Sequence, residues 1–200
     1  GSSGKDVFQG IVGGDLGDGT TVTAGDSIVG GDGSNDTFNI SVTGTATDAV
    51  NITGVNADVE KILFSNLDKR AADSTNYDAS LSNGLTTVGF SNSTATGDTV
   101  FTGLQNIVDA EMTRGEADLT VTYVNSAVSG DSDTATLTLS AQTAGTFTEA
   151  GGAGGLEILN VVSESAANDV DITSGNNTIS TVNISGDQDL TTTVTSNVIE

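Results

Sequence analysis

The 200-residue chain contains no cysteine, histidine, proline or tryptophan. Without cysteine it can form neither a disulfide bond nor a thiolate metal site. Without histidine it has no imidazole to act as a general base or to bind zinc or copper. The metal ions that suit its side chains are therefore the hard cations that prefer oxygen ligands, Ca²⁺ above all.

Basic residues are also scarce, with 5 Lys and Arg against 27 Asp and Glu and a net charge of −22. This balance argues against nucleic acid and anionic lipid as partners, because both are bound through Lys and Arg. No apolar run reaches the length of a membrane span, which predicts no membrane insertion. The chain does not begin with a signal-peptide pattern. If the protein is exported, its export signal lies outside this chain or it uses a route without an N-terminal signal.

High net charge with few aromatic residues is also typical of disordered chains. However, 35% of the residues are hydrophobic, and many of them alternate with threonine or asparagine. Examples are residues 119–123 (LTVTY), 136–139 (TLTL), 170–173 (VDIT) and 181–184 (TVNI). A period of two with β-branched residues predicts strands with one buried face. We therefore expect an ordered all-β protein, with a helical alternative only at residues 57–66.

Glycine and aspartate recur at short intervals over the first 39 residues. The nonapeptide calcium repeat G-G-x-G-x-D-x-U-x is matched, except at its second glycine, by Gly1, Gly4, Asp6 and Phe8. The next nine residues continue the spacing with Gly10, Gly13 and Asp15. In such repeats the glycines form tight turns, and the aspartates supply hard anionic oxygens. Residues 1–4 (GSSG) also match an expression-tag remnant, which would remove the first repeat.

This stretch supplies the candidate calcium ligands. The segment GGDGSND (residues 30–36) is one residue too long, so either Asn35 or Asp36 takes the ligand position. The complete candidate set is Asp6, Asp15, Asp18, Asp26, Asp32, Asn35 and Asp36. Two of these, Asp18 and Asp26, lie outside the nonapeptide register. The alternative is a set of ordinary turns, since Gly and Asp are common turn residues; we interpret the later pairs Asp131/Asp133 and Asp187/Asp189 in that way.

Beyond residue 40 a short, variable sequence motif recurs along the chain. It reads VEKILF at 59–64, LQNIV at 104–108 and LEILNV at 156–161, and VIE at 198–200 resembles another beginning. Internal repetition with Asn/Thr/Gly-rich turns favours a β-solenoid. The irregular spacing, above all the gap at 140–155, keeps a β-sandwich as the alternative. We expect a Gly/Asp-rich calcium-binding segment at 1–40 that continues into a β-strand-repeat region at 41–200, in a chain that could be part of a longer protein.

Taken in order, several low-complexity phrases resemble bacterial surface-layer proteins of the calcium-binding, RTX-like β-strand-repeat type. They are TAGDSIVGGDGSNDTFN (23–39), VNADVEKILFSN (55–66), YDASLSNGLTTV (77–88), GGLEILNVVSESAANDVDIT (154–173) and TVNISGDQDLTTTV (181–194). The resemblance implies a secreted, cell-surface protein that binds Ca²⁺ and assembles with copies of itself. It implies a structural role without catalysis.

Two other functions remain open at this stage. An adhesin or surface fibre would use the same β-repeats to bind a glycan, such as a cell-surface polysaccharide. A calcium-dependent polysaccharide lyase would need a basic residue beside the metal, and the candidates are Lys69, Arg70 and Arg114. The alternative is that these basic residues form a solvated surface patch paired with nearby acidic residues. Similarity of fold to a lyase would not establish lyase chemistry.

Overall fold

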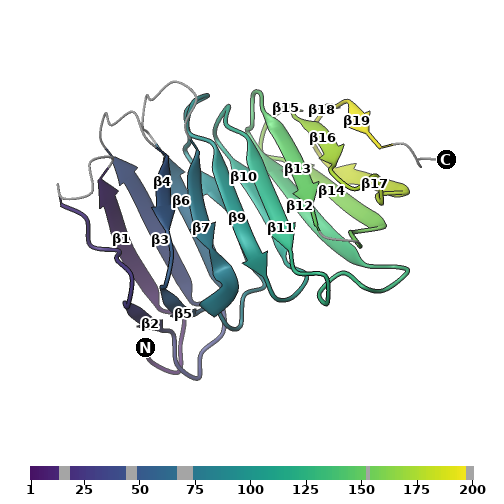
Figure 1. Cartoon of the computed structure of the whole chain (residues 1–200). Coiled ribbons are helices and arrows are strands. Elements are labelled where there is room, and N and C mark those ends of the chain that lie inside the picture. Colours follow the sequence, from purple (N-terminus) through teal and green to yellow (C-terminus); the bar gives the residue numbers. More distant parts are fainter. Residues whose placement is uncertain (14–18, 44–48, 67–73, 152–153, 197–200) are drawn as a thin grey trace.

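The computed structural model describes residues 1–13, 19–43, 49–66, 74–151 and 154–196. The chain is a parallel β-solenoid, in which successive coils stack from the N-terminal end to the C-terminal end (Figure 1). The solenoid prediction is therefore confirmed, and the β-sandwich alternative is wrong. Every strand pairing between named strands is parallel, whereas a sandwich with Greek-key connections would be antiparallel.

The larger sheet contains one strand from each of eight coils. In order along the sheet these are β1 (Val7–Gly13), β3 (Thr37–Thr43), β6 (Lys61–Asn66), β8 (Thr87–Ser91), β10 (Asp109–Thr113), β12 (Thr134–Ser140), β14 (Ile158–Glu164) and β17 (Thr181–Gly186). Sequence order and spatial order coincide, so each coil contacts mainly its neighbours. The boundary drawn from the sequence between segments 1–40 and 41–200 falls within strand β3, so the sheet is continuous across it.

A second, seven-stranded sheet forms the opposite wall of the solenoid. Its strands are β4 (Val50–Ile52), β7 (Thr75–Asp78), β9 (Thr99–Leu104), β11 (Leu119–Tyr123), β13 (Thr146–Ala150), β16 (Asp171–Ser174) and β19 (Val194–Thr195). Short strands line two further corners, namely β2 (Ser27–Val29) with β5 (Asn56–Asp58), and β15 (Asn168–Asp169) with β18 (Leu190–Thr191). Within the described ranges the only helical segment is the 3₁₀ turn η1 (Ala79–Leu81). The helical alternative for residues 57–66 is wrong, because β5 and β6 occupy that stretch.

Register pairs stack equivalent residues of successive coils into rows. One inward row of the larger sheet consists of Gly10, Ile40, Phe64, Phe90, Met112, Leu139, Ser163 and Gly186. Large side chains fill the middle of this row, and small ones lie at its two ends. The strands alternate inward and outward as the sequence predicted, because parallel neighbours must keep the pleat in phase.

Three aromatic rings fill the interior between the two sheets. Phe64 meets Phe101 with ring centroids 5.6 Å apart and Tyr77 with centroids 6.2 Å apart. Both contacts have the edge-on geometry that aromatic pairs favour. All three rings are fully buried, and the Tyr77 hydroxyl is hydrogen-bonded to Ser82 Oγ at 3.1 Å. The aromatic contacts of the core therefore lie in the third and fourth coils.

Loss of the Phe64 ring tests this assignment of the core. We expect Phe64→Ala to lower the free energy of unfolding by about 3–5 kcal/mol, since it removes buried apolar surface and leaves a cavity. Urea unfolding followed by circular dichroism measures this change. The control Leu81→Ala, at a side chain 51% exposed, should cost no more than about 0.5 kcal/mol. Similar losses in the two variants would contradict the assignment.

Candidate functional site

Acidic side chains concentrate at one corner of the solenoid, where the chain enters the eight-stranded sheet. We call the residue immediately before each strand of that sheet its entry residue. It is acidic in five coils, as Asp6, Asp36, Glu60, Asp133 and Glu157. The stack Asp6–Asp36–Glu60 lies in the first three coils and forms what we call the N-terminal entry corner.

Carboxylates at this corner accept backbone hydrogen bonds from the preceding coil. Asp36 Oδ1 accepts from the Asp6 amide at 2.7 Å, and Glu60 Oε2 accepts from the Asp36 amide at 2.7 Å. Glu157 Oε2 accepts from the Asp133 amide in the same way, at 2.8 Å. These amides lie where the strand ladder begins and would otherwise need another acceptor. Bonds to an ionised acceptor are stronger than neutral ones, so these carboxylates bind one coil to the next.

Asp36 is the most unusual member of the entry corner. Its side chain is fully buried, and its second oxygen, Oδ2, has no hydrogen-bond partner. A β-carbon on Gly30 would overlap Asp36 Oδ2, so glycine at that position makes room for the carboxylate. A β-carbon on Gly33 would overlap the carbonyl oxygen of Gly4 and lie 3.3 Å from Asp36 Oδ1. Carboxylate and carbonyl oxygens thus lie close to these two glycines, and such oxygens are ligands that Ca²⁺ prefers.

The other predicted ligands are divided among several places. Asp6 stacks on Asp36, because the Thr37 amide donates to the Asp6 carbonyl oxygen at 2.9 Å. The Asp6 carboxylate accepts from the Ser2 amide, and this bond lowers the pKa of Asp6. Asp26 accepts from the Thr23 amide at 2.7 Å within its own turn, at a different corner. Asp32 and Asn35 are exposed in the loop before Asp36, and Asp15 and Asp18 lie outside the described residues.

The register of the first nonapeptide fits the structure, but that of the second does not. Asp36, and not Asn35, occupies the position equivalent to Asp6. Gly10, expected to begin a second glycine turn, instead lies in the middle of β1. A β-carbon there would overlap Val22, and it would lie 2.9 Å from the Phe38 ring. Gly10 is therefore small for packing reasons. Among the described residues, no three acidic side chains converge in the manner of a metal site, so carbonyl oxygens and water would have to complete any coordination.

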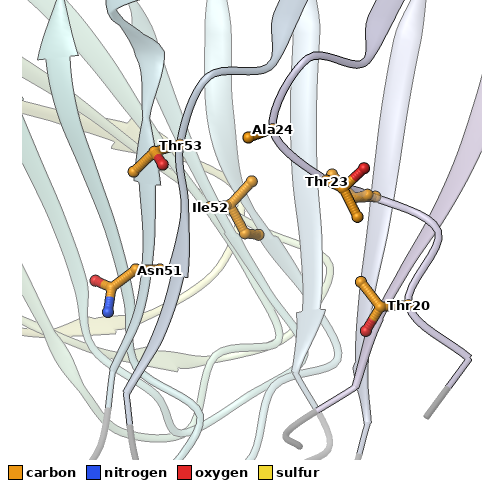
Figure 2. Close-up of a pocket in the computed structure, with 7 residues that line it drawn as sticks. Thr20, Thr23, Ala24, Asn51, Ile52 and Thr53 are labelled. Atoms are coloured by element: carbon orange, nitrogen blue, oxygen red, sulfur yellow. The ribbon is translucent and has the colours of Figure 1, made fainter. Parts of the chain in front are cut away.

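A groove of about 460 Å³ opens beside the edge of the seven-stranded sheet. Figure 2 shows Thr20, Thr23 and Ala24 on one side of it and Asn51, Ile52 and Thr53, on or next to β4, on the other. The Gly25 amide donates to the Gly54 carbonyl oxygen at 2.8 Å and closes one end. Hydroxyl and amide groups at the rim could bind a polar ligand, while Val22 and Ile52 supply apolar surface. None of the lining residues is aromatic.

The basic residues required by a lyase are only partly described. Lys69 and Arg70 lie outside the described residues. Arg114 is exposed and follows β10, so it lies at the end of the larger sheet opposite to the entry residues. The only ion pair in the part of the chain that the structure describes joins Lys61 to Glu111 at 2.6 Å.

Two acidic entry residues were missed as functional candidates. Glu60 and Glu157 both occur in the repeated phrase, as V-E-K-I and L-E-I-L, and both take the same structural position. The repetition was therefore a usable signal for their shared role. Glu149 belongs to β13 and faces the interior of the solenoid. It does not lie in a repeated motif, and it is considered below.

Comparisons with known proteins add no relative. No protein-family model matches the chain, and neither a curated protein nor a solved structure is significantly similar to it. No helix among the described residues is long and apolar enough to cross a membrane. The functional argument therefore depends on the geometry alone.

Truncation of Glu60 tests the entry-corner hydrogen bonds. We expect Glu60→Ala to lower the free energy of unfolding by about 1–3 kcal/mol, because the Asp36 amide loses its acceptor. Glu60→Gln keeps an amide oxygen at that position and should lose less. The urea midpoints of the two variants are compared with that of the wild-type chain. If all three midpoints are equal, this hydrogen bond contributes nothing to stability.

Proposed function

We propose that this protein is a non-enzymatic extracellular structural protein. In this proposal Ca²⁺ stabilises its solenoid at the N-terminal entry corner, and copies of the chain assemble into a surface layer or filament. The single observation that carries the proposal is the buried Asp36 carboxylate, with an unpartnered Oδ2 beside Gly30. An ionised carboxylate in such a place needs a compensating charge.

A metal ion is a better candidate for that charge than a side chain. Five basic residues must serve 27 acidic ones, and the one described ion pair uses Lys61 elsewhere. The entry corner offers carboxylate and carbonyl oxygens and neither sulfur nor imidazole. Ca²⁺ accepts such ligands in flexible geometry and completes its shell with water. Mg²⁺ should substitute poorly because it requires a smaller octahedral shell.

Calcium dependence of thermal stability tests this part of the proposal. A ligand that binds only the folded state at a hundredfold excess over its dissociation constant adds about 2.7 kcal/mol. We therefore expect a higher melting temperature in millimolar Ca²⁺ than in chelator at the same ionic strength. Asp36→Asn should reduce this difference, and the control Asp169→Asn, at an exposed aspartate, should keep it. Coincident melting of the wild-type chain in calcium and chelator would refute the proposal.

In this proposal, copies of the chain meet through the first and last strands of the larger sheet. Within the described residues β1 pairs only with β3, and β17 pairs only with β14. Ile184 in β17 is 56% exposed, whereas Val161, its register partner in β14, is fully buried. An unpaired strand edge is a template for another strand. Because all strands of the sheet run in one direction, the β1 edge of a second copy would continue the β17 edge without reversing it.

Such a head-to-tail contact joins two different surfaces and therefore extends without closing. The net charge of −22 opposes association. Bound Ca²⁺ would neutralise part of it, and salt screens the remainder beyond about 8 Å at physiological ionic strength.

Sedimentation at constant ionic strength tests the assembly, with Ca²⁺ exchanged for Na⁺. We expect larger species in calcium. Ile184→Asp should abolish them by placing a charge on the proposed contact. The control Leu81→Asp changes another exposed apolar residue, in the third coil and away from both edges. A chain that stays monomeric in calcium at high concentration would exclude self-assembly.

The second candidate is an adhesin that binds a glycan in the groove beside β4. Its hydroxyl and amide rim favours this use. However, the lining residues offer no aromatic ring on which a sugar could stack. We therefore rank the adhesin below the assembling structural protein.

A further inference from the structure

A second buried carboxylate lies in the C-terminal half of the solenoid, far along the chain from the entry corner. Glu149 belongs to β13 and points inward, in register between Val121 and Ser174. It is fully buried, and its Oε1 has no hydrogen-bond partner. Its Oε2 lies 3.4 Å from Ser174 Oγ. Other members of its row are apolar or small, so the carboxylate is not required by the packing of the core.

A second unpartnered oxygen faces the same point. The side-chain oxygen of Thr178, Oγ1, is buried and also lacks a partner. A β-carbon on Gly155 would overlap Thr178 Oγ1 and would lie 3.0 Å from Glu149 Oε1. The backbone of Gly155 does not have a positive φ angle, so conformation does not demand glycine there. Glycine instead lets the backbone of residue 155 lie close to both oxygens. We call this group of oxygens around Gly155 the Glu149 cradle.

A backbone oxygen completes the cradle, and a groove adjoins it. A β-carbon on Gly151 would lie 2.9 Å from the Gly154 carbonyl oxygen and 3.4 Å from Glu149 Oε1. That carbonyl accepts one hydrogen bond, from Asn176 Nδ2 at 2.7 Å, and keeps a second lone pair. Gly154 and Thr178 also line an open groove of about 460 Å³ that includes Asp131 and Glu157. Two members of the cradle therefore adjoin an acidic surface, although Glu149 itself does not line the groove.

The charges around the cradle are negative or neutral. Burial raises the pKa of Glu149, hydrogen bonds from the Leu156 amide and the Ser174 hydroxyl lower it, and the nearby carboxylate of Glu157 raises it again. Tyr123 also lies close: burial raises its pKa, and the charge of Glu149 adds to that rise. No ion pair links Glu149 to a basic residue in the described parts of the chain. Apart from these two hydrogen bonds, nothing described around the carboxyl group offsets a negative charge on it.

We propose that the Glu149 cradle is a second cation site, in which Glu149 Oε1, Thr178 Oγ1 and the Gly154 carbonyl oxygen bind a hard cation such as Ca²⁺. A cation satisfies both unpartnered oxygens together and cancels the repulsion from Glu157. The remaining ligands come from water in the adjoining groove, as in many calcium sites. This site is independent of the entry corner, and it does not rest on the proposed function.

Terbium luminescence tests the site in the full-length chain, because Tb³⁺ occupies calcium sites and is excited through a nearby tyrosine. We expect tyrosine-sensitised emission that Ca²⁺ displaces. Tyr123→Phe should remove the emission, and the control Tyr77→Phe should keep it. Glu149→Gln preserves the shape of the side chain and should weaken Tb³⁺ binding by about tenfold or more, since affinity follows the charge of the ligands.

A second pair of variants keeps the test independent of the carboxylate. Thr178→Val removes the hydroxyl oxygen at nearly constant shape and should also weaken Tb³⁺ binding. The control Thr148→Val changes a partly exposed threonine on the opposite face of β13 and should not. In an Asp36→Asn background, Ca²⁺ should still raise the melting temperature, and adding Glu149→Gln should remove that rise.

The outcomes separate this site from the entry corner. If Asp36→Asn abolishes all Tb³⁺ emission while Glu149→Gln leaves it unchanged, the cradle is not a cation site and Glu149 holds a proton. If Glu149→Gln and Thr178→Val bind Tb³⁺ as the wild-type chain does, the proposal is likewise overturned. Loss of the calcium effect in Glu149→Gln alone would support the cradle and count against the entry corner.

Discussion

The parallel register between coils is the constraint on which the rest of the structure depends. Hydrogen bonds hold neighbouring strands about 4.8 Å apart, so each residue stacks on its equivalent in the next coil. The inward rows then become continuous apolar columns that no coil could bury alone. Substitutions are also coupled along a row: Gly10 lies next to Ile40, and Phe64 next to Phe90, because each column must fill the same interior.

Variation in coil length is confined to the corners by this register. Val7 pairs with Thr37, 30 residues later, whereas Thr87 pairs with Asp109 after 22 residues. Corner amides that lie beyond the regular ladder therefore need other acceptors, and acidic side chains provide several of them. Asp118 Oδ1 accepts from the Thr146 amide at 2.7 Å, as Glu60 does for Asp36. Several acidic side chains thus hydrogen-bond one coil to the next, in addition to keeping the surface solvated.

Sequence periodicity predicted the strands well because an inward face must be apolar. The alternating runs at 119–123 and 181–184 lie within strands β11 and β17. The gap at 140–155 had counted against a solenoid, yet it contains β13, whose inward Glu149 interrupts the apolar alternation. Asp171 reads as a solvated strand residue, but its Oδ1 accepts from the Thr193 amide at 2.9 Å. Contacts between coils of unequal length cannot be inferred from local spacing, so these roles were not predictable.

The two buried carboxylates follow one physical logic although their sequences differ. Asp36 and Glu149 each place an unpartnered oxygen beside a glycine, Gly30 in one case and Gly155 in the other. A β-carbon at Gly30 would overlap Asp36 Oδ2, and one at Gly155 would overlap Thr178 Oγ1, so both arrangements of oxygens require glycine. With only five basic residues in the chain, a bound cation neutralises such a charge at less cost in specific packing than a long basic side chain. In the proposed sites, binding of the ion would become part of the folding free energy, since the ligands come together only when the coils have stacked.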